Sequence, residues 1–363
     1  MRNASSWRRR RHLITAAAAA ITAALSLAAC SSGSASTGSS GSGPAHTYNM
    51  SMMLNFAPNG EDAAFYYGVK QGIFKKNGVN LTIVPGTTSA NTITAVTSGK
   101  INVGFASVKN LLVSEAAGQK TKSVGNMFGI GSNGVFVDKD SGITDIKQLS
   151  GKTIIAADSG IEALLTALVK QQGGTPPKYA TVTSAAINTT YASGKGDGLL
   201  TSIPFGEAAV GAQRPSDTIS LASAGLNIPD YTFFVSPSYY AKNKPAIRAF
   251  LTGMYQSVVA TTKNYDAAGA AVHASVTSVP ADVAADTIKD YAQYICAPSM
   301  TGKSIGYMAQ SDWDKAVTSF IGAKLLPAGF SAKGMLTNEF VTGSKPVTSQ
   351  VCPIDGVSAP SNG

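Results

Sequence analysis

The chain has 363 residues, of which 44 % are hydrophobic and only 13 % are charged, so it is long enough for two domains and too apolar to be disordered. Its formal net charge of +9 does not indicate nucleic-acid binding, because five of the 29 basic residues lie in the first 11 positions. The other 24 basic residues face 20 acidic ones and form no run that would neutralise phosphates. Composition therefore favours a globular protein without a nucleic-acid partner.

Residues 1–29 have the organisation of a signal peptide. A basic region precedes an alanine-rich apolar run that ends at Leu27-Ala-Ala-Cys30. A run of this length with small residues at its end is typical of an export signal, and an uncleaved membrane anchor is the alternative. The segment resembles a bacterial lipoprotein signal, in which Cys30 becomes the lipidated first residue. Arg9 and Arg10 also resemble a twin-arginine signal, although His12 stands where Phe is usual, so the export route stays open.

A tether is predicted next, over residues 30–46. Ser and Gly dominate residues 31–45 and cannot bury apolar surface, so the stretch should span about 20 Å as a flexible coil. The protein is therefore expected to be exported and lipid-anchored to the outer face of the cytoplasmic membrane. Cys296 and Cys352 would then lie in an oxidising compartment, where an even pair suggests a disulfide; two buried free thiols are the alternative.

Strands and helices alternate along the rest of the chain. Short apolar strands are predicted at residues 48–54, 79–84, 101–105, 152–156, 218–221 and 232–235. Apolar residues recur at helical spacing in residues 161–173, which Gly173 ends, and in residues 244–259, where Pro245 suits the first turn. This alternation predicts an α/β fold with parallel sheets covered on both faces. Residues 245–340 are mostly helical, which fits two lobes whose C-terminal helices return to the first.

The sequence contains few residues or motifs that are typical of catalytic sites. Beyond residue 46 the one histidine is His273, which sits in a bland helical context, so a Ser-His-Asp or Cys-His arrangement is not expected. The chain has neither transition-metal ligand spacing nor a phosphate-binding loop. We therefore expect no catalytic residue, no metal and no cofactor, and the sequence favours recognition over catalysis.

A family resemblance follows from the order of several segments. Residues 57–107, with Gly72-Ile-Phe74 and Gly99-Lys-Ile-Asn-Val-Gly104, resemble the first-lobe signature of ABC-transporter solute-binding proteins of the thiamine-pyrimidine, alkanesulfonate, taurine and nitrate type. The resemblance continues through residues 141–160, 226–256 and 325–341 and covers most of residues 48–340. It implies a periplasmic-binding-protein type II fold, with two parallel-sheet lobes joined by two crossover segments.

The resemblance also implies an organisation and partners. Lobe 1 would comprise residues 47–133 plus 236–363, and lobe 2 residues 134–235, with crossings near Gly129–Val137 and Thr232–Pro237. Gly129, Gly131 and Gly134 would suit the hinge, and plain turn glycines are the alternative. A small solute, an ABC permease and an ATPase are the implied partners, with the binding protein a monomer.

Five loops should line the cleft between the lobes. Hydroxyl groups and free N–H groups at helix starts can hold an anion or a polar ring edge, although ordinary helix capping explains each of them equally well. An aromatic side chain beside the second crossing is available to stack on a flat ligand. The residues expected to bind the ligand are Phe56, Asn59, Asp62, Gly86, Thr87, Thr88, Ser107, Asp158, Ser159, Gly160, Ser202, Phe205, Glu207 and Tyr231.

Two adjacent acids, Glu61 and Asp62, receive different roles. Asn59 with Asp62 three residues on is a helix-start arrangement, so Glu61 is expected at the solvent rim, whereas the resemblance directs Asp62 into the cleft. Asp62 stands where the pyrimidine-binding branch usually has His, and Asn102 replaces the customary Asp.

An acid in the pocket disfavours a naked anion and suits ring N–H or amino donors, so a heteroaromatic, pyrimidine-like solute is preferred. A sulfonate, taurine or nitrate is the alternative ligand. A pyrimidine-synthase-like enzyme on the same fold is the alternative function, although the chain lacks the histidine and Cys-rich metal motif of those enzymes.

Overall fold

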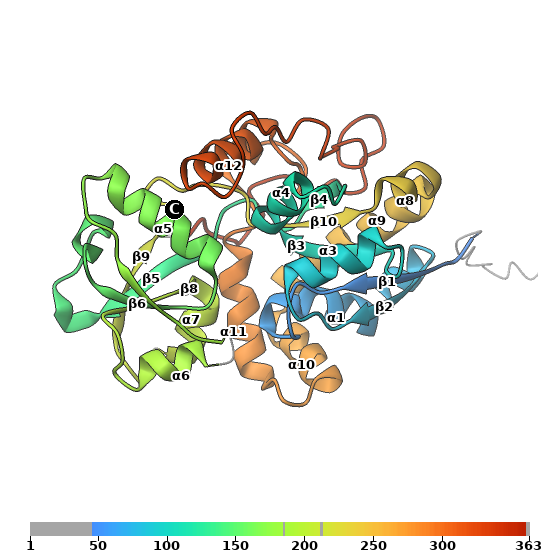
Figure 1. Cartoon of the computed structure of the whole chain (residues 1–363). Coiled ribbons are helices and arrows are strands. Elements are labelled where there is room, and N and C mark those ends of the chain that lie inside the picture. The colour runs from blue at the N-terminus through green and yellow to red at the C-terminus, as the bar shows by residue number, and fades with distance from the viewer. Residues whose placement is uncertain (1–45, 184–185, 211–212, 361–363) are drawn as a thin grey trace, which may run out of the picture. The chain divides into compact units, whose positions relative to one another are not determined.

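The computed structural model describes residues 46–183, 186–210 and 213–360 (Figure 1). The predicted signal peptide (residues 1–29), Cys30 and all of the tether except residue 46 lie outside the described residues. In the part of the chain that is described, no helix is both long and apolar enough to cross a membrane.

The first sheet has five strands in the order β2-β1-β3-β10-β4. Its strands are β1 Tyr48–Met53, β2 Val79–Val84, β3 Val103–Ser107, β4 Lys122–Asn126 and β10 Tyr231–Val235. β1 runs parallel to β2 and β3, whereas β10 is antiparallel to both of its neighbours, β3 and β4.

The second sheet also has five strands, in the order β7-β6-β8-β5-β9. Its strands are β5 Asn133–Asp138, β6 Thr153–Ala156, β7 Lys178–Thr181, β8 Gly198–Ser202 and β9 Ser216–Ser220. β6 runs parallel to β7 and β8, whereas β5 is antiparallel to β8 and β9.

The α/β class and all six predicted strands are confirmed, but the sheets are mixed where parallel sheets were predicted. Each sheet contains one antiparallel strand, β5 or β10. Both come directly after a segment that passes from one sheet to the other, so each enters its new sheet from the edge at which the other strands end. The result is two mixed sheets.

The second crossing also lies earlier than predicted. Residues 232–235 belong to β10 of the first sheet, so the expected crossing at Thr232–Pro237 is wrong. The chain passes between the sheets at residues 127–132 and 221–230. The two segments meet where Asp230 N donates to Phe128 O at 3.1 Å. Apart from this strand, the predicted lobe boundaries stay a prediction.

The glycines expected at the hinge are closely packed. A Cβ atom at Gly129 would lie 2.6 Å from Met300 Sδ, and one at Gly134 would lie 2.7 Å from Ile203 Cγ1. Gly134 lies inside β5, and a Cβ atom at Gly131 would meet Ile228 O at 3.3 Å. Close packing therefore accounts for Gly129 and Gly134, and a hinge role for the three stays a prediction.

Twelve α-helices of the described residues surround the sheets, and amphipathic spacing explains the longest of them. The apolar face of α9 is fully buried at Ile247, Phe250 and Leu251, and the helix packs on α1 and α2. The helices are α1 Ala63–Lys70, α2 Ile73–Lys76, α3 Ser89–Thr97, α4 Val108–Ala116, α5 Ser159–Gln171, α6 Ile187–Ala192, α7 Ile203–Val210, α8 Pro237–Lys242, α9 Lys244–Thr262, α10 Tyr265–Ser275, α11 Ala281–Ala292 and α12 Gln310–Gly322.

Two C-terminal helices connect elements of both sheets. α11 contacts α7, which follows β8 of the second sheet, and it also contacts α10 and the 3₁₀ turn η1 (Gly60–Asp62) beside the first sheet (Figure 1). α12 packs against α5, and one apolar cluster includes Leu111 of α4, Leu164 of α5 and Trp313 of α12. These contacts bring groups from distant parts of the chain to the space between the sheets.

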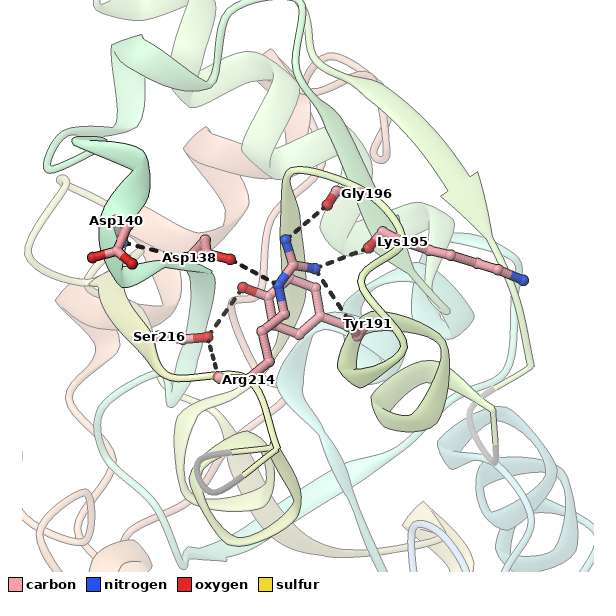
Figure 2. A network of polar contacts seen from close by, with 7 residues as sticks. All are labelled: Asp138, Asp140, Tyr191, Lys195, Gly196, Arg214 and Ser216. Atoms are coloured by element: carbon pink, nitrogen blue, oxygen red, sulfur yellow. Dashed lines mark hydrogen bonds and ion pairs between the residues drawn. The ribbon is translucent and has the colours of Figure 1, made fainter.

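Arg214 forms a network of hydrogen bonds at one end of the second sheet (Figure 2). Its Nε donates to Asp138 Oδ2 at 3.3 Å, and its other nitrogens donate to the backbone carbonyls of Tyr191, Lys195 and Gly196 at 3.1 to 3.2 Å. The guanidinium also lies 4.0 Å from the centroid of the Tyr191 ring. The register of β5 and β8 places this network at the end of the sheet opposite Asn133 and Ser202, so it supports the sheet without entering the site described below.

Cys296 and Cys352 form a disulfide in the structure, with their Cα atoms 5.6 Å apart, which joins the segment after α11 to the C-terminal tail. We expect a chain carrying Cys30→Ser to titrate no free thiol under denaturing, non-reducing conditions and two after reduction. Removing this cross-link by reduction should lower the free energy of unfolding by about 2–4 kcal/mol. Two reactive thiols in the unreduced, unfolded chain would contradict the disulfide.

Candidate functional site

A cleft of about 310 Å³ lies where strands of the two sheets end. Residues just after β1, β2 and β3 line one side of it, and residues after β6, β8 and β9 line the other. Open α/β sheets bind their ligands in crevices outside the carboxyl ends of their strands. The cleft is therefore where this fold is expected to bind a ligand.

The structure brings eight of the fourteen predicted site residues to this cleft. Thr88 and Ser107 also cap α3 and α4, since their side chains accept from Asn91 N and Asn110 N, both at 3.2 Å. Each of these two residues thus caps a helix and also lines the cleft. The eight are Phe56, Asn59, Thr88, Ser107, Asp158, Ser202, Phe205 and Tyr231.

The other six predicted residues do not line the cleft: Asp62, Gly86, Thr87, Ser159, Gly160 and Glu207. Ser159 and Gly160 form the first turn of α5, where Gly160 N donates to Asp158 Oδ1 at 2.8 Å. Glu207 is exposed on α7, and Thr87 is exposed with its hydroxyl accepting from Asn91 Nδ2 at 2.7 Å. Gly160 and Thr87 thus form local hydrogen bonds at the helix starts.

Glu61 and Asp62 occupy the opposite environments to those predicted. Asp62 is fully buried, and its Oδ2 accepts from Asn59 N at 3.0 Å in a capping box. The expectation that Glu61 lies in solvent is wrong, because this residue is 4 % exposed and lines the cleft. The cause is α11, which approaches so closely that a Cβ atom at Gly60 would lie 2.5 Å from Thr287 Cβ.

Three buried carboxyl groups gather at or behind this wall of the cleft. Burial raises the pKa of Glu61 well above its usual range, and the neighbouring Asp62 and Asp230 carboxylates add to the shift. Burial also raises the pKa of Asp62 to about 7 and that of Asp230 to about 6. Asp230 Oδ2 accepts from Ser132 N at 3.0 Å and from Ser132 Oγ at 2.6 Å, which ties together the two segments that connect the sheets.

Lys109 and Asp158 form an ion pair across the cleft. Lys109 belongs to α4 beside the first sheet, and Asp158 caps α5 beside the second. The Lys109 side chain is 10 % exposed and the Asp158 side chain 48 %. Partial burial opposes ionisation of Asp158, but Lys109 and the N–H groups of the α5 first turn outweigh it and keep the pKa of Asp158 below its usual value. The pair therefore holds the two sides of the cleft together.

Replacing Asp158 by Asn tests this ion pair. Asn still caps a helix, so the change removes the charge and leaves Lys109 largely buried without its partner. We expect the free energy of unfolding to fall by about 1–2 kcal/mol, less than for a fully buried pair because Asp158 is half exposed. Chemical denaturation measures the loss.

Asp145→Asn is the matched control, because Asp145 is exposed and only accepts from Lys147 N, at 2.6 Å, at the start of a 3₁₀ turn. It should change stability by less than about 0.5 kcal/mol. Equal effects of the two substitutions would contradict a stabilising pair.

Two tyrosines form aromatic surfaces of the cleft. The rings of Tyr291 and Phe128 stack with their centroids 5.0 Å apart. The Tyr231 ring lies edge-on to that of Phe128, with 6.3 Å between the centroids. The hydroxyl groups of Tyr291 and Ser202 are 2.7 Å apart, which joins α11 to the end of β8. Burial raises the pKa of both tyrosines well above their usual range, so both remain neutral hydrogen-bonding groups.

Sequence reasoning missed nine polar residues that line the cleft: Asn55, Glu61, Ser89, Lys109, Asn110, Asn133, Thr201, Asp230 and Tyr291. Signals existed for some of them, since Asp230 precedes Tyr231 and Lys109 comes two residues after Ser107. Tyr291 gave none, because it reaches the cleft from a C-terminal helix far from the predicted loops.

Two mixed α/β sheets with a cleft at their strand ends are the architecture of periplasmic binding proteins, and solved structures show this likeness. The alkanesulfonate-binding protein SsuA from Xanthomonas axonopodis pv. citri, bound to MOPS, is 15 % identical, with a TM-score of 0.61 over 81 % of this chain and 99 % of that one. The nitrate-binding protein NrtA from Synechocystis PCC 6803 is 12 % identical, with a TM-score of 0.61 over 79 % of this chain and 84 % of that one.

The family follows from the sequence comparison. The chain belongs to the NMT1/THI5-like family, whose model matches residues 59–268, more than half of its length. A curated relative is the 4-amino-5-hydroxymethyl-2-methylpyrimidine phosphate synthase of Aspergillus parasiticus, which is 27 % identical over 152 residues. The match covers 42 % of this chain, and the chain spans 44 % of the relative's length.

Proposed function

We propose that the protein is the exported solute-binding component of an ABC importer, anchored to the membrane through Cys30 and acting as a monomer. The observation that carries the proposal is the cleft between two sheets, closed by contacts from both sides such as Lys109 with Asp158 and Tyr291 with Ser202. Opening at the connecting segments would break these polar contacts and release a solute to a permease. The structural likeness to SsuA and NrtA supports the fold on which this function depends.

The preferred ligand is a small heteroaromatic, pyrimidine-like solute. Tyr231 and Tyr291 offer flat apolar surfaces, and the Glu61 carboxyl and Asn55 amide oxygens offer acceptors for ring N–H or amino groups. A sulfonate, taurine or nitrate is less suited, because Lys109, the one cationic residue among the described lining residues, is already paired with Asp158. The names of the curated relatives favour the same class of compound.

Those names also make a pyrimidine-synthase-like enzyme the second candidate function. The cleft contains neither His nor Cys among its described lining residues, so the described part of the site supplies no side chain of the kind that those enzymes need. Catalysis would require the solute to change, whereas transport requires it to leave intact.

Native mass spectrometry of the purified protein, followed by thermal shifts against pyrimidines, sulfonates, taurine and nitrate, tests the function. We expect one unchanged solute to be retained and to stabilise the protein by about 2.7 kcal/mol at one hundred times its dissociation constant. Conversion of that solute into a product would favour the enzyme instead. A protein that neither retains nor is stabilised by any small molecule would contradict both and favour a surface adhesin.

A further inference from the structure

The cleft has an excess of acidic groups over basic ones. Glu61, Asp158 and Asp230 all line it, and the one cation among the described lining residues, Lys109, is paired with Asp158. Glu61 and Asp230 have no ion-pair partner in the described part of the chain. Asp62 lies directly behind Glu61 and adds a third buried carboxyl group. These carboxyl groups repel an anion when they are ionised, and a bound cation would instead favour their ionised forms.

Two buried acceptors at this wall are also unsatisfied. Within the described residues, Glu61 Oε1 and Asn55 Oδ1 find no hydrogen-bond donor, although the two residues are only 4 % and 6 % exposed. A buried acceptor without a partner loses its hydration and gains no hydrogen bond in return, so two of them lining one cleft indicate groups that a ligand completes. Asp230 differs, because Ser132 already donates twice to it. The ligand-facing acceptors are thus Glu61 and Asn55.

The aromatic residues set the shape of that ligand. Tyr231 and Tyr291 line the same cleft, and the Ser202 hydroxyl and the stacked Phe128 ring hold Tyr291 in place. The face of a tyrosine ring attracts cations and stacks on flat groups. A quaternary ammonium would satisfy the charge but has no N–H for the two acceptors. A flat cation bearing N–H groups satisfies the charge, the acceptors and the rings together.

We propose that the cleft selects a planar organic cation with at least two N–H donors, such as an amidinium or a protonated amino-heterocycle, and that Glu61 and Asn55 receive those N–H groups. The proposal deepens the proposed function, on which it rests, by assigning the charge class of the solute and the residues that determine it. Glu61 is the main determinant, because a bound cation favours its ionised form, and the carboxylate then supplies both the opposite charge and a free acceptor.

Three probes of one size and shape separate charge from fit: benzamidinium, benzamide and benzoate. Calorimetry on the intact chain should show benzamidinium binding at least about tenfold more tightly than benzamide, which corresponds to about 1.4 kcal/mol. Benzoate should not bind measurably. This comparison uses the wild-type chain, so no folding defect of a variant can decide it.

The variant Glu61→Gln tests the assignment to a residue. Gln keeps an acceptor and nearly the same volume but removes the charge, so the preference for benzamidinium over benzamide should fall to about twofold or less, the remainder reflecting hydrogen bonds alone. Glu339→Gln is the matched control, since Glu339 pairs with Lys244 and lies outside the cleft lining. It should leave the preference unchanged.

The outcomes of these experiments test the cation selectivity separately from the proposed solute-binding function. Tighter binding of benzoate or benzamide than of benzamidinium, or an unchanged preference in Glu61→Gln, would overturn the proposal while leaving a solute-binding protein. If none of the three probes binds, the solute retained in native mass spectrometry decides: a planar cation supports the proposal, and a neutral or anionic compound overturns it. Retention of no solute at all would overturn the proposed function itself.

Discussion

Raising the pH from about 5 to about 8 should lower the free energy of unfolding of the ligand-free protein by several kcal/mol, against the usual behaviour of surface carboxylates. The groups responsible are Glu61, Asp62 and Asp230, at or behind the cleft wall, with the pKa of each raised mainly by burial. Each pKa unit corresponds to about 1.4 kcal/mol of stability. Asp62, whose pKa rises from 3.8 to about 7, accounts for about 2.7 kcal/mol of the change by itself, because about two pKa units lie between pH 5 and its folded-state pKa.

The direction of this effect follows from proton binding. A carboxyl group with a raised pKa in the folded state holds its proton at a pH where the unfolded chain has lost it. Its stabilising contribution is therefore complete below about pH 4 and is lost as the pH rises through about 6 for Asp230 and about 7 for Asp62. Asp158 has a lowered pKa and acts in the opposite direction, but only in more acidic solution. Between about pH 5 and about pH 8 the buried acids thus dominate.

Urea denaturation at a series of pH values measures the effect. Asp62→Asn keeps an oxygen that can accept from Asn59 N and removes the titration, so it should flatten the pH dependence and stabilise the protein at about pH 8. Asp282→Asn, an exposed carboxylate at the start of α11, should leave the slope unchanged. A free energy of unfolding that is constant or rises over this pH range would contradict raised pKa values for these acids in the folded state.

Gly86→Ala should lower the free energy of unfolding by about 3 kcal/mol or more and remove solute binding. Gly86 lies in the loop after β2, and a Cβ atom there would stand 2.0 Å from Leu54 O. That oxygen belongs to the backbone, so no side-chain rotation relieves the clash. Gly86 N also donates to Phe56 O at 3.0 Å, so the loop that carries Asn55 and Phe56 would have to move as well.

Gly322→Ala is the control for this substitution. Gly322 is the last residue of α12, and a Cβ atom there would meet nothing within 4 Å. Alanine favours a helix over glycine, so the change should be neutral or stabilise by up to about 1 kcal/mol. Calorimetric melting compares the two variants. A loss below about 1 kcal/mol in Gly86→Ala would mean that the two loops separate easily.

Local patterns predicted the strands and helices well because burial is periodic along each element. β2 begins and ends at the predicted residues, 79–84, and the apolar spacing of residues 161–173 corresponds to α5. The direction of two strands was predicted wrongly. The antiparallel course of β5 and β10 depends on where the chain enters each sheet, and side-chain alternation is the same in both directions.

The sequence alone determined the α/β class, the strand-end loops that carry Thr88, Ser107 and Asp158, and a local helix start at Asn59 and Asp62. Each depends on neighbours in the chain, through hydrogen-bond capping and apolar periodicity. Only the tertiary structure decided which acid faces the cleft. α11, more than two hundred residues after η1, covers Gly60 and buries Glu61, and it brings Tyr291 to the same cleft. Burial and ion pairing depend on that long-range packing, so the packing determined which acidic and aromatic side chains line the site.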